Sequence, residues 1–309
     1  RPMTERSRNG SEMTVGLDLG DKFSHFCVLD ESGEVLEEGR VTTTTRGLSQ
    51  RFVSLPASRV ALEVGTHSPW VDRLLSGMGH EVLVANARKL RLIYQNESKD
   101  DRLDAERLAR LARVDPRLLH PIRHRDGASQ EAMAVLRSRR VLVESRAKLV
   151  NHVRGAVKSY GSRLKSCSTA SFHKQAAHQI PDGLHAALDA VLEMIGDLTR
   201  KIRHSDQQIE RLAEEQYPQT TLLRQVSGVG ALTALWFILA LGDPHRFRSS
   251  RRVGAYLGLR PRRSQSGDDD PELRITKVGD RELRRLLVTA AHYILGPFGV
   301  DSDLRRWGL

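Results

Sequence analysis

Cysteine is scarce in this sequence, and histidine never occurs in a metal-binding motif. The 309 residues include two cysteines, Cys27 and Cys167, which are far apart and form no C-x-x-C motif. This excludes a disulfide framework and a zinc ribbon. The twelve histidines form no H-E-x-x-H motif and no paired metal-ligand spacing. Any bound metal ion is therefore expected to have carboxylate ligands.

Long apolar runs are also missing. No run approaches the ~20 apolar residues that a membrane-spanning helix needs, and residues 1–12 lack the apolar core of a signal peptide. We therefore expect a soluble, cytoplasmic protein without a membrane partner. The chain of 309 residues is long enough for two domains and connecting helices, with a core that needs no covalent staples.

The charge is strongly one-sided. Lysine and arginine number 49 against 38 aspartate and glutamate residues, which gives a formal net charge of +11. Such an excess favours a polyanionic partner over a neutral metabolite. Nucleic acid is the expected partner, which would associate the protein with the nucleoid; by charge alone an anionic membrane surface ranks second.

The first region, residues 13–115, has the alternating pattern of a mixed α/β domain. After three strands within residues 14–45, we expect a helix, a strand, a helix and a strand, at residues 48–55, 59–65, 68–80 and 81–86. This element order is that of the ribonuclease-H-like fold. A further helix at residues 100–114, with Leu103, Leu108 and Leu111 on or near one face, ends before Pro116.

The second region, residues 116–219, is predicted to be a helical, coiled-coil connector. Apolar residues at alternating steps of three and four run through residues 184–212, apart from Ser205, and a similar but interrupted pattern occupies residues 133–157. Two such seams indicate a long helical hairpin. The pattern leaves open whether the hairpin is a spacer packed on itself or a dimerisation arm.

The third region, residues 220–309, is predicted to be mostly helical. It contains the sequence S-G-V-G at residues 227–230 between two apolar helical stretches. In a helix-hairpin-helix, Gly228 and Gly230 would let backbone amides approach a nucleic-acid phosphate. A simple tight turn is the alternative, and it is the commoner role for such a sequence.

Four carboxylates stand out as candidate metal ligands. Asp18 and Glu63 lie at the centre of two predicted strands with apolar neighbours, where an unpaired carboxylate would be costly. Asp101 and Asp104 share one helix face because they are three residues apart. If the first and fourth strands are neighbours, these acids could hold two Mg²⁺ ions for phosphoryl transfer. The alternatives are hydrogen-bonded acids at strand ends and acids placed to stabilise a helix dipole.

Several segments together resemble a known family. The segments GLDLG, ALEVGTHSPW, KDDRLDAERLA, VSGVG, GAYLGLRPRRSQSG and RITKVGDRELRRLL are similar to those of the DEDD transposases of the insertion-sequence one-hundred-and-ten family, relatives of the Piv DNA invertase. The resemblance covers residues 15–309. It implies a RuvC-like first domain, a helical connector and a C-terminal transposase domain. It also implies a Mg²⁺-dependent serine recombinase, and several members are directed to DNA by a structured RNA from the element itself. We expect the protein to act as a homo-oligomer, either a dimer or a tetramer.

The resemblance assigns roles to individual residues. The DEDD acids fall on the four carboxylates named above, and the nucleophilic serine falls on Ser266. Gly267 would let the loop approach the DNA backbone, while Arg260, Arg262 and Arg263 would hold the attacked phosphate and its developing charge.

Two other functions remain open on the sequence. A RuvC-like endonuclease would use the four carboxylates to cleave branched DNA with water as the nucleophile. A truncated, non-catalytic nucleic-acid binder would need only the basic C-terminal region. Ser264 is a competing nucleophile, and Asp268, Asp269 and Asp270 would repel a phosphate unless they point away from it.

Overall fold

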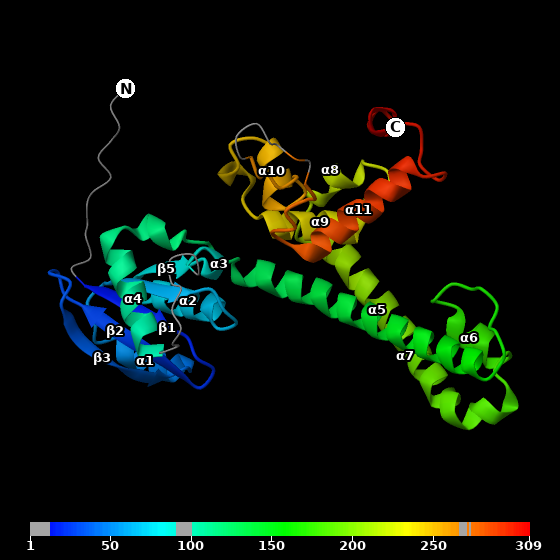
Figure 1. Ribbon diagram of the computed structural model, residues 1–309, viewed down its shortest axis with the longest axis horizontal. Coiled ribbons are helices and arrows are strands. Elements are labelled where there is room, and N and C mark those ends of the chain that lie inside the picture. The colour runs from blue at the N-terminus through cyan, green and yellow to red at the C-terminus, as the bar shows by residue number, and fades with distance from the viewer. Residues whose placement is uncertain (1–12, 91–100, 266–270, 272) are drawn as a thin grey trace. The chain divides into compact units, whose positions relative to one another are not determined.

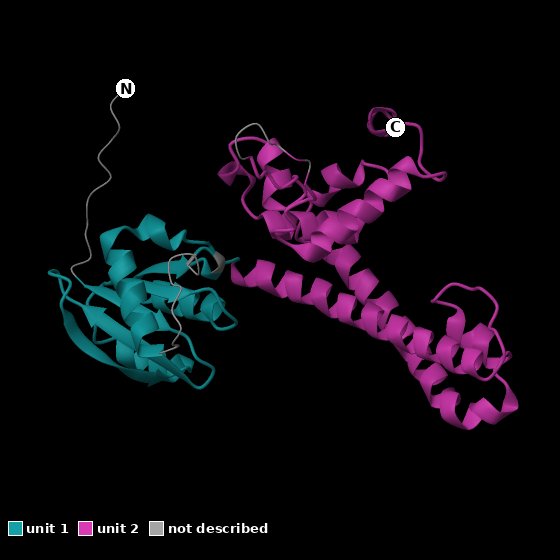
Figure 2. Cartoon of the chain, viewed as in Figure 1, with its two compact units in different colours: residues 1–125 teal, residues 126–309 magenta. Residues whose placement is uncertain are grey.

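A computed structural model describes residues 13–90, 101–265, 271 and 273–309 of the chain. The chain forms two compact units, residues 1–125 and residues 126–309 (Figure 2). The first unit is mixed α/β and the second is helical. Within the described part of the chain, no helix is both long and apolar enough to span a membrane.

A five-stranded sheet forms the centre of the first unit (Figure 1). Its strands are β1 (Thr14–Asp18), β2 (Phe23–Leu29), β3 (Val35–Thr42), β4 (Arg59–Glu63) and β5 (Glu81–Ala85). They lie in the order β3-β2-β1-β4-β5. The first three strands form an antiparallel meander, whereas β1, β4 and β5 are parallel. The predicted strands are confirmed, as is the expectation that the first and fourth strands are neighbours.

Alternating residues of the sheet face two different sets of helices. Val15, Leu17, Val60 and Leu62 belong to one buried cluster with residues of α1 (Thr45–Phe52) and α2 (Ser68–Gly77). The opposite face packs against α4 (Asp101–Val114), which contacts β1, β2 and β4. The short helix α3 (Ala87–Leu90) and the 3-10 turn Pro116–Leu119 complete the unit.

The α4 helix lies unusually close to the sheet because small residues meet at the contact. Its buried residues are Ala105, Leu108, Ala109 and Ala112. Of the three leucines expected on or near one face, Leu108 is buried, while Leu103 is 41% exposed. The expectation was therefore only partly right: the helix packs chiefly through alanines, which allow a backbone approach that leucines would block.

A long helical hairpin dominates the second unit (Figure 1). It consists of α5 (Gly127–Ser159) and α7 (His185–Glu215), which pack along one another, with α6 (Phe172–Ala177) and the 3-10 turn Asp182–Leu184 between them. Val150, Val153 and Val157 share a buried cluster with Leu188 and Ile195. The predicted hairpin is confirmed, and its apolar seams pack against each other within one chain.

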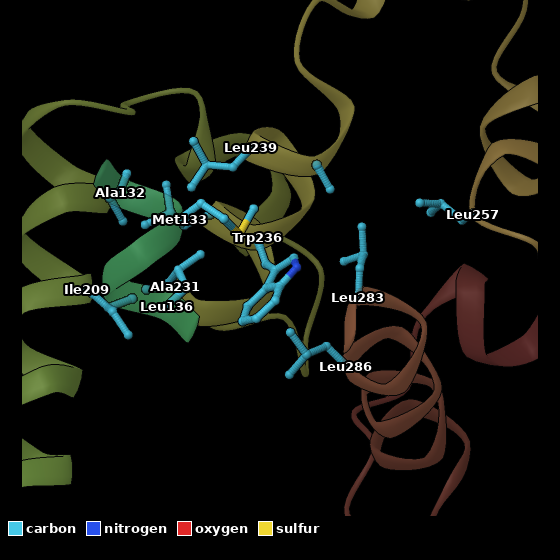
Figure 3. Packing of buried hydrophobic residues seen from close by; sticks show 13 residues of the cluster. Ala132, Met133, Leu136, Ile209, Ala231, Trp236, Leu239, Leu257, Leu283 and Leu286 are labelled. Atoms are coloured by element: carbon cyan, nitrogen blue, oxygen red, sulfur yellow. The ribbon is translucent and has the colours of Figure 1, made fainter. Parts of the chain in front are cut away.

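The remaining helices pack at the other end of the hairpin. They are α8 (Thr220–Arg224), α9 (Ala231–Leu241), α10 (Arg251–Tyr256), α11 (Arg281–Leu295) and α12 (Asp303–Gly308), with the 3-10 turn Pro244–Arg246. Their common core, drawn in Figure 3, gathers residues of α5, α7, α9 and α11 around Trp236. This side chain is only 2% exposed. Its ring nitrogen donates a hydrogen bond to Asp280 Oδ2 at 3.1 Å, which satisfies the one polar group of the buried indole.

We predict that Gly16→Ala destabilises the first unit by roughly 1–3 kcal/mol, because the added methyl group overpacks the contact between β1 and α4. A Cβ at Gly16 would overlap the carbonyl oxygen of Ala105 and lie 2.6 Å from the amide nitrogen of Ala109. Both obstacles are backbone atoms, so the helix would have to move. Urea unfolding measures the loss. Gly77→Ala is the matched control, because a Cβ there meets no atom within 4 Å; equal effects of the two substitutions would contradict the prediction.

Candidate active site

Asp18 and Glu63 are the last residues of two neighbouring parallel strands. The register aligns Leu17 of β1 with Leu62 of β4, so both acids lie at the carboxyl edge of the sheet. Both are half-buried. The expectation of strand-centre acids needs correction, because each strand ends at its acid. Each carboxylate is therefore accessible at the sheet edge and is not enclosed by apolar neighbours.

Asp101 and Asp104 lie in the first turn of α4, as the sequence predicts. A histidine links this turn to the sheet: His25 on β2 is the direct partner of Asp18 in the strand register, and its Nδ1 lies 4.0 Å from Asp101 Oδ2. Asp104 accepts a hydrogen bond from Arg107 Nη1 at 3.3 Å. Sequence reasoning missed His25, because its place beside Asp18 follows from the strand register alone.

The donor chemistry of this edge fits a hard divalent cation. All four acids offer oxygen ligands, and they come from two adjacent strand ends and from a helix packed on those strands. Among the described residues, however, no three metal-ligating side chains already converge at a single point. Binding of a divalent cation by these four acids would therefore require the carboxylates to move closer together.

Ser266 and Gly267 lie outside the described residues, but the flanks of their loop are well defined. Residues 260–262 and 274–276 pair as a short antiparallel ladder, with a bridge between Pro261 and Ile275. The amide of Arg262 donates to the carbonyl of Arg274 at 3.0 Å, and the amide of Thr276 donates to the carbonyl of Arg260 at 2.9 Å. The loop that carries the candidate serine therefore starts and ends at one fixed pair of strands.

This ladder adds a basic residue that sequence reasoning did not assign. Arg260, Arg262 and Arg274 are all exposed, and the pairing places Arg274 directly opposite Arg262. Arg263, the third assigned arginine, follows on the same arm and is also exposed. The arginines thus come from both arms of the ladder, although they are separated in sequence.

Close backbone contacts fix the base of the ladder. Gly258 has φ +71°, and a Cβ there would overlap the backbone of Val278. Gly279 has φ +74°, and a Cβ there would overlap the carbonyl oxygen of Tyr256. Arg284 Nη1 donates to the carbonyls of Leu257, at 3.0 Å, and of Val278. Only glycine combines these dihedrals with this proximity, so the two strands leave the helical core at a set position.

The segment that leads into the ladder and includes its first arm is rich in arginine and lacks acidic residues. Residues 244–265 contain seven arginines and no aspartate or glutamate. The guanidinium of Arg246 lies 4.5 Å from the ring centre of Tyr256 and 4.7 Å from that of Phe247. Such stacking holds the arginine by its flat face.

The S-G-V-G turn at residues 227–230 lines a pocket of about 480 Å³. The lining comes from the end of α8, the turn, α9 and α11 and comprises Arg224, Val226, Ser227, Gly228, Val229, Gly230, Thr233, Leu286, Thr289, Ala290 and Tyr293. Gly228 has φ +88°, and a Cβ there would lie 2.8 Å from the Tyr293 ring. Gly230 has φ −88°, and a Cβ there would meet no atom within 4 Å. Gly228 is therefore required by the fold, whereas the fold gives no reason for glycine at position 230.

Two family models match this chain in order. A transposase model of the DEDD type matches residues 15–161, and the model of the transposase IS116/IS110/IS902 family matches residues 220–297. The chain belongs to this family of transposases.

Similar proteins agree with this family. The transposase for insertion sequence element IS1328 of Yersinia enterocolitica is 28% identical, over 95% of this chain and 87% of that protein. The transposase for insertion sequence element IS1111A of Coxiella burnetii is 27% identical, over 94% and 80% of the two chains. The pilin gene-inverting protein of Moraxella bovis is 30% identical over 31% of this chain. As a transposase, the protein is a DNA-processing enzyme, and DNA is its partner.

We predict that Gly230→Ala weakens DNA binding by the transposase several-fold, because the methyl group would keep a phosphate away from the turn. The cost to folding should stay below about 1 kcal/mol, since the backbone there suits any residue. Titration of labelled duplex DNA and urea unfolding measure the two effects. Gly228→Ala should instead destabilise the fold by roughly 1–3 kcal/mol. Unchanged DNA affinity in the Gly230 variant would leave the segment a tight turn without a binding role.

Proposed function

We propose that this transposase cuts and rejoins DNA strands by phosphoryl transfer, with a DEDD carboxylate site and Ser266 as the nucleophile. The observation that carries the proposal is the edge described above. Asp18 and Glu63 end adjacent parallel strands, and His25 joins the Asp18 position to Asp101 at the start of α4. The strand order and directions also support a ribonuclease-H-like, RuvC-like domain.

Each step of the proposed reaction forms one P–O bond and breaks one. The Ser266 hydroxyl oxygen attacks a DNA phosphorus, an Oγ–P ester forms, and one P–O bond to deoxyribose breaks. The leaving sugar oxygen takes up the proton that the serine loses. Attack by the sugar oxygen of another strand then reverses these changes, so the exchange needs no external energy source.

We propose separate roles for the carboxylates and the arginines in this reaction. Asp18, Glu63, Asp101 and Asp104 would hold Mg²⁺, and we propose two ions. When bound, these ions would stabilise charge on the attacked phosphate and on the leaving oxygen. Arg260 and its neighbours on the ladder would orient the phosphate, because guanidinium groups match its oxygens in pairs.

Two partners complete the proposal. Rejoining two DNA duplexes involves breaks in several strands, and each chain carries one serine loop, so we propose a homo-oligomer, either a dimer or a tetramer. The resemblance to RNA-directed members and the net charge of +11 support a structured guide RNA.

We predict that Ser266→Ala abolishes strand exchange, with a loss of roughly 10³-fold or more, because no other group would form the covalent ester. The assay uses DNA carrying the ends of the encoding element, Mg²⁺ and the element's transcripts, and omission of the transcripts tests the RNA partner. Mass spectrometry of the serine peptide should find a nucleotide adduct in the unaltered protein. Ser264→Ala is the control and should retain exchange. Cleavage without an adduct, unaffected by Ser266→Ala, would instead establish a nuclease that uses water.

We predict that Glu63→Gln removes both strand exchange and the stabilisation of the first unit by Mg²⁺, because an amide is a weaker ligand for a hard cation than a carboxylate. Thermal unfolding with and without Mg²⁺ measures ion binding independently of activity. Glu31→Gln makes the same change at an exposed turn residue, and should leave both properties intact. An unchanged Mg²⁺ response in the Glu63 variant would refute its role as a ligand.

A further inference from the structure

A second acid-free stretch lies far along the sequence from the candidate serine loop. Residues 145–181 contain no aspartate or glutamate. They contain seven lysine and arginine residues: Arg146, Lys148, Arg154, Lys158, Arg163, Lys165 and Lys174. This stretch forms the last part of α5, the connection after it and α6, at the end of the hairpin away from α9 (Figure 1). Positive charge is therefore concentrated at one end of the second unit.

These cations have no carboxylate partner among the described residues. In the part of the chain that the structure describes, none of the seven forms an ion pair. Two of them have other contacts: Arg154 lies 5.0 Å from the ring centre of Phe172, and Arg146 Nη1 donates to the Thr199 hydroxyl at 3.3 Å. The other five are exposed to solvent. Their charges are thus neutralised neither by acids nor by burial.

The accumulated charge affects two neighbouring groups. Burial lowers the pKa of Arg146, and the nearby Arg139 and Arg203 lower it further against the opposing effect of Asp206. Burial also lowers the pKa of His173, and Lys174, Arg200 and Arg203 add to the shift. Burial is the larger cause for both groups, and the neighbouring cations add a positive potential that a polyanion would relieve.

The first acidic residue after the stretch is the exposed Asp182 of the 3-10 turn, and the next ones lie on the returning helix α7. In the first half of α7, Asp189 Oδ1 lies 2.9 Å from His185 Nδ1, and Asp197 accepts a hydrogen bond from Arg200. Glu193 is exposed between them. Of the carboxylates on α7, Asp189 and Asp197 thus already interact with basic residues of their own helix.

A compact core supports the basic end. Phe172 of α6 is fully buried with Val153, Val157 and Leu192 of the hairpin. The exposed cations take no part in this core, so the fold does not require their charge. A rigid surface that presents unneutralised cations is suited to phosphate groups, which are fixed at regular intervals on a nucleic acid.

We propose that this end of the hairpin is a second DNA-binding surface, which contacts the phosphate backbone of duplex DNA away from the cleavage point. The surface, termed the hairpin tip, consists of the exposed residues Lys148, Lys158, Arg163, Lys165 and Lys174. The proposal rests on DNA being the substrate, but it needs neither Ser266 nor the metal site.

The length of the hairpin places the tip far from the helices at its other end, which carry the candidate serine loop. The 31 residues of α7 span about 45 Å at 1.5 Å per residue, which corresponds to about 13 base pairs of duplex DNA. The tip would therefore contact the phosphate backbone of DNA that flanks the exchange site. Such contacts position the protein on the duplex and read no sequence.

The test removes three charges from the tip without touching the core. A variant with Lys158→Gln, Arg163→Gln and Lys165→Gln is compared with the unaltered protein for binding to a labelled duplex of about 40 base pairs, in EDTA and over a range of salt. We expect affinity to fall roughly tenfold near physiological salt and the salt-dependence slope to fall by about three units, one for each lost phosphate contact.

The control makes equal substitutions elsewhere on the hairpin. Arg137→Gln, Lys201→Gln and Arg211→Gln remove three exposed cations outside the acid-free stretch, and should change the affinity less than about twofold. Thermal unfolding checks that both variants are folded. Equal weakening in both variants would show an effect of net charge alone and would overturn the tip proposal.

Further outcomes separate the proposals. Unchanged DNA binding by the tip variant would overturn the tip proposal, as would loss of binding only to duplex RNA or to vesicles containing phosphatidylserine. A protein that binds no duplex DNA at all would overturn both the tip and the proposed function. Loss of strand exchange in Glu63→Gln while the tip effect persists would support both, because binding in EDTA does not depend on the metal site.

Discussion

The candidate active site depends on the close approach of one helix to one strand. At Gly16 the backbone of β1 lies against the backbone of α4 at Ala105, with no room for a side chain. This contact sets the height of α4 above the sheet. The first turn of the helix, with Asp101, is thereby held beside His25 and the end of β1. A larger residue at the contact would lift the acids of the helix away from those of the sheet.

The second unit also contains backbone-to-backbone contacts at glycine residues, which here fix the base of the ladder. Gly258 and Gly279 bring backbone against backbone where the ladder leaves the core. Asp280 then caps α11 by accepting from the amide of Leu283 at 2.9 Å, while its other oxygen bonds the buried Trp236. One aspartate therefore connects the core, the helix start and the base of the serine loop.

Charge is distributed in blocks along the chain. Residues 244–265 and residues 145–181 lack acids entirely, and each block lies at a different end of the second unit. In the first unit, the strand register brings Asp18 and Glu63, which are far apart in the sequence, to the same end of the sheet. The two kinds of region match the two parts of the proposed reaction, in which basic surfaces would hold phosphates along the DNA and the acids would bind Mg²⁺ at the cleavage point.

The sequence by itself determined the five strands, the long hairpin and the neighbouring placement of β1 and β4, because hydrophobic periodicity and element order are local properties. It also singled out Asp18, Glu63, Asp101 and Asp104 as candidates. Only the tertiary structure decided that both strand acids end their strands, that alanines form the packing face of α4, and that His25 and Arg274 lie beside assigned residues. These facts depend on strand register and on backbone distances between segments far apart in the chain, which no local pattern encodes.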